Sequence, residues 1–104
     1  FEPLRIKASQ VDRLEAEVDQ LNEKLTPLNS FILPGGTPAA AHLHVARAVA
    51  RRAERAIVAL AAVENISPET VKFANRLSDL LFVAARYAND QGRADILWKP
   101  GANR

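Results

Sequence analysis

A ladder of basic side chains on one predicted helix is the part of this sequence best suited to chemistry. His44, Arg47, Arg51 and Arg55 follow one another at intervals of three, four and four residues. That spacing places side chains on one face of an α-helix. Small apolar residues stand between them, and guanidinium groups held on a dry surface are well suited to binding phosphate oxygens. The ladder therefore predicts a polyphosphate site, with ion pairs to nearby carboxylates as the structural alternative.

Composition narrows the classes of protein to consider. Hydrophobic residues make up 48% of the 104 residues and charged residues 25%, which is typical of one globular domain. The net charge of +2 is too small to favour a nucleic-acid partner. The absence of cysteine and the presence of only two histidines argue against disulfides and structural zinc. No apolar run approaches the roughly 20 residues of a membrane span, so we expect no membrane partner and a cytoplasmic protein.

The sequence contains no methionine, and this bears on its completeness. We expect Phe1 not to be a translation start and the chain to be part of a longer protein. Residues 1–104 are accordingly predicted to form a single helical domain that lacks its N-terminal portion.

The first predicted helix runs from about Ser9, or one turn earlier, to Leu25. Ser9 and Asp12 have the spacing of a capping box at the start of a helix. Apolar residues then recur every three or four positions, which predicts a single apolar seam; they are Val11, Leu14, Val18, Leu21 and Leu25.

Two further helices follow a loop over Thr26 to Thr37, in which Gly35-Gly36 permits positive φ angles. Each begins with a hydroxyl residue followed by proline, a strong start signal: Thr37-Pro38 and Ser67-Pro68. They are predicted to end at about Val63 and Asn89. The pattern indicates an all-α, antiparallel helix bundle, with the apolar tail at residues 96–100 docked on it.

The second of these helices is apolar or small on more than one side. Such a helix usually lies in the centre of a bundle or at a subunit interface. We therefore expect residues 38–63 to be buried by other helices or by another subunit.

Three sequence blocks together resemble the PduO-type ATP:cob(I)alamin adenosyltransferases. They are FILPGG, LHVARAVARRAER and FANRLSDLLFVAAR, within residues 29–88. The glycine-rich ATP loop that this family carries near its N-terminus, of the Thr-Arg-Thr-Gly-Asp type, is absent here. The resemblance implies a five-helix bundle, of which the three helices are part, and a homotrimer with active sites between subunits. It also implies transfer of the 5′-deoxyadenosyl group of ATP to cob(I)alamin, with Mg²⁺ accompanying ATP, by a protein of which this part alone is inactive.

The resemblance assigns roles around ATP. Arg55 matches an arginine that contacts the ATP phosphates, and Glu54 in the RRAER block matches a residue able to hold ATP or its magnesium. Asn75 in the NRLSD block matches an asparagine at the ATP site. For Arg55 the competing interpretation is an ion pair with a neighbouring carboxylate.

Roles on the corrin side follow from the same resemblance. Phe31 matches the aromatic residue against the lower face of the corrin, where it displaces the lower axial ligand of cobalt. Arg51 matches an arginine near the corrin, and together with Phe31 and Arg55 it completes the expected catalytic set. His44, like His42, is expected to be structural, and a place at the rim of the corrin pocket is the alternative for His44. The competing interpretation of Phe31 is an anchor that packs its loop onto the core.

The remaining polar residues are expected to be structural. Arg47 and Arg52 are assigned to the bundle or the interface, and Arg76 and Asp79 to a polar network inside the bundle. His42 and His44 are two residues apart and diverge on a helix, so they do not form a metal pair. A non-catalytic module of the same fold, which binds cobalamin or a partner protein, is the alternative function.

Overall fold

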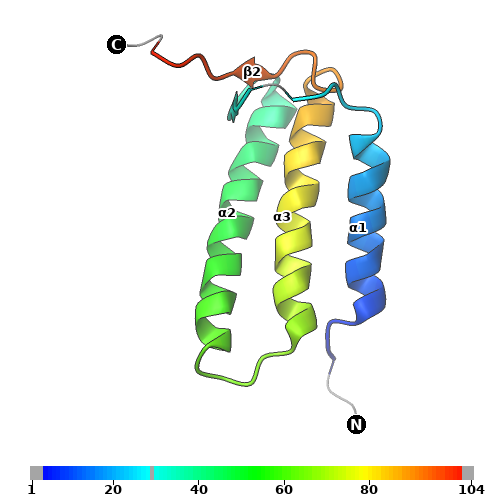
Figure 1. Ribbon diagram of the computed structural model, residues 1–104, viewed down its shortest axis with the longest axis vertical. Helices are drawn as coiled ribbons and strands as arrows, with labels where there is room; N and C mark the ends of the chain where they lie inside the picture. The colour runs from blue at the N-terminus through cyan, green and yellow to red at the C-terminus, as the bar shows by residue number, and fades with distance from the viewer. Residues whose placement is uncertain (1–3, 29, 102–104) are drawn as a thin grey trace.

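Three long helices form a single layer in the computed structural model, which describes residues 4–28 and 30–101. They are α1 (Ala8–Asn22), α2 (Pro38–Ala61) and α3 (Pro68–Ala88). Figure 1 shows α3 between the other two, with α2 antiparallel to both α1 and α3. α3 packs against α1 and against α2. The predicted all-α fold is confirmed.

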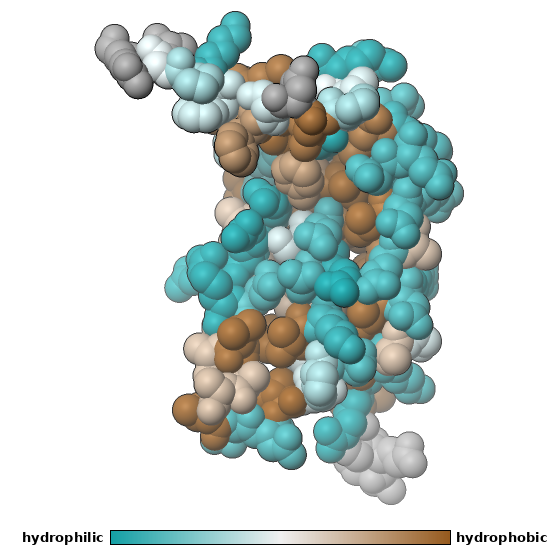
Figure 2. Space-filling model, viewed as in Figure 1, coloured by the Kyte–Doolittle hydropathy of each residue, from teal (hydrophilic) through white to brown (hydrophobic). Residues whose placement is uncertain are grey.

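The centre of the layer is α3, so of the two places predicted for α2, the centre of a bundle or a subunit interface, the first does not apply within the described residues. α3 buries the small residues Ala74, Ser78 and Ala85, which let two neighbouring helices approach it closely. α2 instead exposes much of its apolar surface, and Val45 and Val49 are 63% and 62% exposed. Figure 2 shows apolar side chains gathered over the lower end of α2. The second half of the prediction, a subunit interface on α2, is taken up below as a proposal.

The starts of α2 and α3 are those predicted. The Thr37 hydroxyl accepts a hydrogen bond from the Ala40 amide at 3.2 Å, and the Ser67 hydroxyl accepts one from the Glu69 amide at 3.2 Å. Proline at the first helical position costs no hydrogen bond, because the amide there would have no partner within the helix. α2 ends at Ala61, two residues before the predicted Val63.

α1 starts at Ala8, within the predicted range, but its capping differs from the prediction. Lys7 rather than Ser9 is the N-cap residue, and Gln10 Oε1 accepts a hydrogen bond from the Lys7 amide at 2.8 Å. A side chain at the third helical position can satisfy the cap amide, and Gln10 does so here. The helix ends at Asn22 instead of Leu25, because the chain tightens into turns in which each amide bonds three residues back, Lys24 to Leu21 and Leu25 to Asn22.

A short β-ribbon closes one end of the layer. Strand β1 (Ile32–Leu33) pairs antiparallel with β2 (Ile96–Leu97), and Ile32 lies opposite Leu97. The Trp98 amide donates to the Phe31 carbonyl at 2.7 Å, and the Ser30 hydroxyl donates to the Trp98 carbonyl at 3.0 Å. Figure 1 shows β2 above the end of the bundle where α2 begins and α3 ends. The tail was predicted to dock on the bundle, but within the described residues β2 packs against β1 and against no helix, so that prediction is wrong. Within residues 4–28 and 30–101, no helix has the length and apolar character needed to cross a membrane.

Candidate functional site

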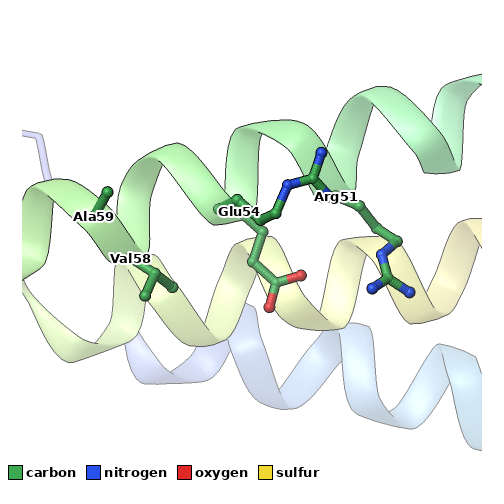
Figure 3. Close-up of a pocket in the computed structure, with 5 residues that line it drawn as sticks. Arg51, Glu54, Val58 and Ala59 are labelled. Atoms are coloured by element: carbon green, nitrogen blue, oxygen red, sulfur yellow. The ribbon is translucent and has the colours of Figure 1, made fainter.

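Two arginines of the ladder line a shallow pocket on the exposed side of α2. Arg51, Glu54 and Arg55 line it together with Val58 and Ala59, and its volume is about 320 Å³. The four charged or polar positions of the predicted ladder do not share one environment, because only Arg51 and Arg55 are exposed. Figure 3 shows Glu54 directed from α2 toward the neighbouring helix. The pocket thus combines two guanidinium groups, neither of them in an ion pair among the described residues, with one carboxylate and two apolar side chains.

The Glu54 carboxylate is held by α3. Asn75 Nδ2 donates to Glu54 Oε2 at 3.1 Å, and Arg76 Nη1 donates to Asn75 Oδ1. Arg76 Nε also donates to Glu15 Oε1 of α1 at 2.6 Å. Since Asn75 Oδ1 is occupied by an arginine donor, the Asn75 amide must present its NH₂ group to Glu54. A relay of polar contacts therefore runs from α1 through α3 to the pocket on α2.

Arg47 and His44 lie on the side of α2 that faces α3. The Arg47 guanidinium stands over the Phe82 ring, 4.8 Å from its centre, a cation–π contact. His44 is buried, and its Nε2 has no hydrogen-bond partner among the described residues. Burial, and secondarily the charge of Arg47, lower the pKa of His44, while Asp95 opposes the shift. The burial of His44 fits the structural interpretation, and in this structure His44 does not form an open rim.

Phe31 stands at the other end of the candidate site, on the ribbon. Its side chain is 76% exposed and meets Trp98 edge to face, with ring centres 5.9 Å apart. Leu28, Ser30 and Pro100 join these two residues around an open hollow of about 510 Å³. A residue that anchors its loop to the core would be buried, so the anchoring interpretation of Phe31 does not fit.

The predicted site residues thus fall into two groups. The structure brings Arg51, Glu54, Arg55 and Asn75 together, and it places Phe31 apart from them. Arg51 lies 13 residues beyond Pro38, which is about 20 Å along a helix. Within the described residues, the hollow beside Phe31 on the ribbon and the arginine pocket on α2 are therefore separate surfaces.

The other predicted structural residues are more exposed than expected. Asp79 lies at the surface in a shallow groove between α1 and α3, beside Glu15 and Arg76. No hydrogen bond joins Asp79 to Arg76 within the described residues, so Asp79 borders the polar network rather than joining it. Arg52 is exposed. His42 is exposed as well, and its ring Nδ1 is hydrogen-bonded to the Pro38 carbonyl at 2.7 Å.

Three buried polar residues near the ribbon were not anticipated from the sequence: Arg86, Asn89 and Asp95. Arg86 Nε donates to Asp95 Oδ2 at 2.7 Å, and both side chains are almost fully buried. The only sequence signal was an arginine within an apolar run at the end of a helix. Its partner lies beyond the turn that follows the helix, so the pairing depends on how the chain folds back.

Comparison with known proteins connects this geometry to a family. The sequence model described as cobalamin adenosyltransferase matches residues 1–88. The corrinoid adenosyltransferase of Mycobacterium tuberculosis is 54% identical over 106 residues, which cover 98% of this chain and 53% of that protein. The corrinoid adenosyltransferase PduO of Salmonella typhimurium is 43% identical over 93 residues, covering 88% of this chain and 28% of that protein. The chain spans about half the length of the first of these two relatives.

Two solved structures from Lactobacillus reuteri resemble the fold described here. Both are variants of a PduO-type ATP:corrinoid adenosyltransferase. The first replaces a phenylalanine by alanine and holds cobalamin and ATP; it aligns with a TM-score of 0.80 at 42% identity over 93% of this chain and 54% of that one. The second replaces an arginine by lysine and holds ATP; it aligns with a TM-score of 0.82 at 41% identity over 93% of this chain and 55% of that one.

Proposed function

Because this chain belongs to the cobalamin adenosyltransferase family, we propose that the intact protein transfers the 5′-deoxyadenosyl group of ATP to cob(I)alamin. The cobalt(I) electron pair forms the new bond to the 5′ carbon. The bond between that carbon and the phosphate oxygen breaks, and triphosphate leaves with its electrons. Cobalt is the nucleophile, so the protein needs no serine, cysteine or base of its own. The observation that carries the proposal is the pocket of Arg51, Glu54 and Arg55 on α2.

The arginine pocket is the proposed binding site for the ATP phosphates. None of the ion pairs within residues 4–28 and 30–101 involves Arg51 or Arg55. This favours a ligand over the ion-pair alternative for Arg55. A hydrogen bond from a charged group to a phosphate contributes about 1.5–3 kcal/mol. Arg55 would thus bind ATP and stabilise the leaving triphosphate, while Arg51 lies on the side of the pocket nearer the start of α2.

A magnesium ion is proposed to enter with ATP rather than to reside in the protein. No cluster of three or more metal-ligating side chains occurs in the part of the chain that the structure describes. Mg²⁺ bound to a nucleotide usually takes most of its ligands from phosphates and water and one or two from carboxylates. Glu54, held by Asn75, is the residue that would supply such a carboxylate.

The exposed aromatic end is the proposed contact with the corrin. Phe31 presents its ring to the surface rather than to the core, as a residue against the lower corrin face must. In the two Lactobacillus reuteri structures the replaced phenylalanine and arginine lie 20 positions apart, which is also the spacing of Phe31 and Arg51. The shared spacing supports assigning Phe31 and Arg51 to the catalytic set, with Phe31 displacing the lower axial ligand.

We propose that the protein is a cytoplasmic homotrimer with its active sites between subunits. The apolar side chains exposed on α2, such as Val45 and Val49, offer a surface that a second subunit would bury. Arg47 and Arg52 are assigned to the bundle or this interface. The separation of Phe31 from the arginine pocket is also expected if neighbouring copies complete each site.

The test is an anaerobic assay of the intact protein with ATP and chemically reduced cobalamin. The proposal predicts the optical spectrum of a cobalt–carbon bond and stoichiometric release of triphosphate. Binding of both substrates without product would contradict the proposed enzyme and favour the non-catalytic cobalamin-binding module. Sedimentation of the same sample tests the trimer separately.

A further inference from the structure

The side-chain amide of Asn89 is buried and is hydrogen-bonded to the segment that leads into α2. Asn89 caps the C-terminal end of α3 and is 1% exposed. Its Oδ1 accepts from the Thr37 amide at 2.9 Å, and its Nδ2 donates to the Gly35 carbonyl at 2.9 Å. The two bonds enclose Gly36, whose φ of 103° and closeness to the Asn89 amide leave no room for a side chain. The end of α3 thereby fixes the start of α2.

The same amide also reaches the segment that leads into β2. Asn89 Nδ2 donates to Asp95 Oδ1 at 3.3 Å, and the Asn89 carbonyl accepts from the Ala94 amide at 2.8 Å. Asp95 is held in turn by Arg86, whose Nη2 donates to the Thr26 carbonyl at 2.7 Å. We call Arg86, Asn89 and Asp95 the clasp. The side chains of all three are almost fully buried, where each hydrogen bond resists exchange with water.

The clasp determines where the ribbon stands. Gly35 follows β1 by two residues, and Asp95 directly precedes β2. Phe31 is the residue before β1, and its carbonyl is bonded to the Trp98 amide just after β2. The two strands of the ribbon beside Phe31 are therefore tied to the side-chain amide of Asn89, as is the start of α2.

We propose that Asn89 is a positioning residue for Phe31, which sets the place of the aromatic ring relative to the α2 arginines. This inference rests on the proposed function. Asn89 is buried and does not itself reach a substrate. The arginine pocket begins about 20 Å along α2 from the clasp, so ATP binding does not depend on Asn89. Loss of the amide lets the ribbon and Phe31 shift while the pocket stays in place.

The consequence is selectivity between two corrinoids. Cob(II)alamin carries a lower nucleotide base that must leave cobalt before reduction, and cob(II)inamide has no such base. A misplaced Phe31 therefore slows turnover of cob(II)alamin and leaves turnover of cob(II)inamide nearly unchanged. A general loss of folded protein would slow both equally.

The experiment uses Asn89→Ala in the intact protein, with both corrinoids and one reductant. We expect kcat with cob(II)alamin to fall about tenfold, which corresponds to about 1.4 kcal/mol, and kcat with cob(II)inamide to fall less than about twofold. KM for ATP should stay at the wild-type value. Asn65→Ala, an exposed asparagine in the loop between α2 and α3, is the matched control and should change neither rate. Equal losses with both corrinoids, or a matching rise in KM for ATP, would overturn the inference.

Two further comparisons keep the outcome decisive. If Asn89→Ala does not fold, Ser30→Ala is the second variant, which removes the hydrogen bond to the Trp98 carbonyl beside Phe31. It should show the same selective loss with cob(II)alamin in weaker form. Unchanged selectivity in Ser30→Ala would overturn the inference. Wild-type protein inactive with both corrinoids would refute the proposed function itself. Selective loss in Phe31→Ala without selective loss in the Asn89 and Ser30 variants would refute only the positioning role.

Discussion

Asn75 of α3 holds the carboxylate of Glu54 on α2 through a hydrogen bond of 3.1 Å from Nδ2 to Oε2. Arg76 occupies the other end of the Asn75 amide and fixes its orientation. Asn75, which the NRLSD block matches to the ATP site, thus holds Glu54 in this structure by a hydrogen bond. The arginine pocket on α2 therefore depends on α3 for the geometry of its only carboxylate.

The first prediction concerns Arg55, which lines the pocket without an ion pair among the described residues. Arg55→Ala should raise KM for ATP and lower kcat/KM about tenfold to hundredfold, because one or two charge-assisted bonds to phosphate are lost. Thermal stability should change little. Arg13→Ala, at an exposed arginine of α1, is the control. Parallel losses of stability and activity would support the ion-pair interpretation instead.

The second prediction concerns Arg76, which joins Glu15 to Asn75. Arg76→Ala should free the Asn75 amide to rotate, and KM for ATP should rise about threefold as Glu54 loses its fixed orientation. The half-exposed pair with Glu15 should add only about 0.5–1 kcal/mol to the free energy of unfolding. Steady-state kinetics and urea unfolding measure the two effects. Lys72→Ala, on the exposed side of α3, should show neither; an unchanged KM in Arg76→Ala would mean that the relay does not control the pocket.

The third prediction separates the role of Phe31 from simple packing. Phe31→Ala should slow adenosylation that starts from cob(II)alamin, since displacement of the lower ligand is impaired. Adenosylation that starts from chemically prepared cob(I)alamin should be affected much less, because cobalt(I) has already lost that ligand. KM for ATP should stay near the wild-type value. Equal rates for variant and wild type from cob(II)alamin would remove Phe31 from the catalytic set.

Local sequence signals predicted the starts of α2 and α3 correctly. Thr37-Pro38 and Ser67-Pro68 act through amides within the same turn, so neighbouring residues suffice to identify them. Ser9 was misassigned as the N-cap because the helix is capped two residues earlier, at Lys7, whose amide donates to the Gln10 side chain. Two candidates for one cap cannot be separated by spacing alone.

The arrangement of the helices and the clasp could not be predicted in the same way. The apolar content of α2 indicated burial, yet the small residues of α3 decide which helix lies in the centre. Asn89 looks like an ordinary helix stop in the sequence. Its partners Gly35 and Thr37 lie more than 50 residues away, and no periodic pattern encodes such contacts.

The fourth prediction concerns the buried ion pair of the clasp. Asp95→Asn should lower the free energy of unfolding by about 3 kcal/mol, because Arg86 keeps a buried charge without its carboxylate. Asp90→Asn is a closely matched control, since Asp90 pairs with Arg93 at the exposed surface, and it should change stability little. Denaturant unfolding of the intact protein compares the two. Similar losses of unfolding free energy in both variants would show that the buried Arg86–Asp95 pair contributes no more to stability than the exposed pair.

The last prediction concerns the pH dependence of stability through His44. Burial, with the charge of Arg47, lowers the pKa of His44 in the folded protein below its ordinary value of 6.5, against the opposing effect of Asp95. Below pH 6.5, His44 therefore takes up a proton more readily in the unfolded chain than in the folded chain. The stability that neutral His44 contributes is complete above pH 6.5 and is lost as the pH falls toward the pKa of His44 in the folded protein. His44→Asn should flatten the slope of unfolding free energy on the acid side of pH 6.5. His42→Asn, at an exposed histidine, should leave the slope as in the wild type. An identical slope in the His44 variant would show that another group carries the acid sensitivity.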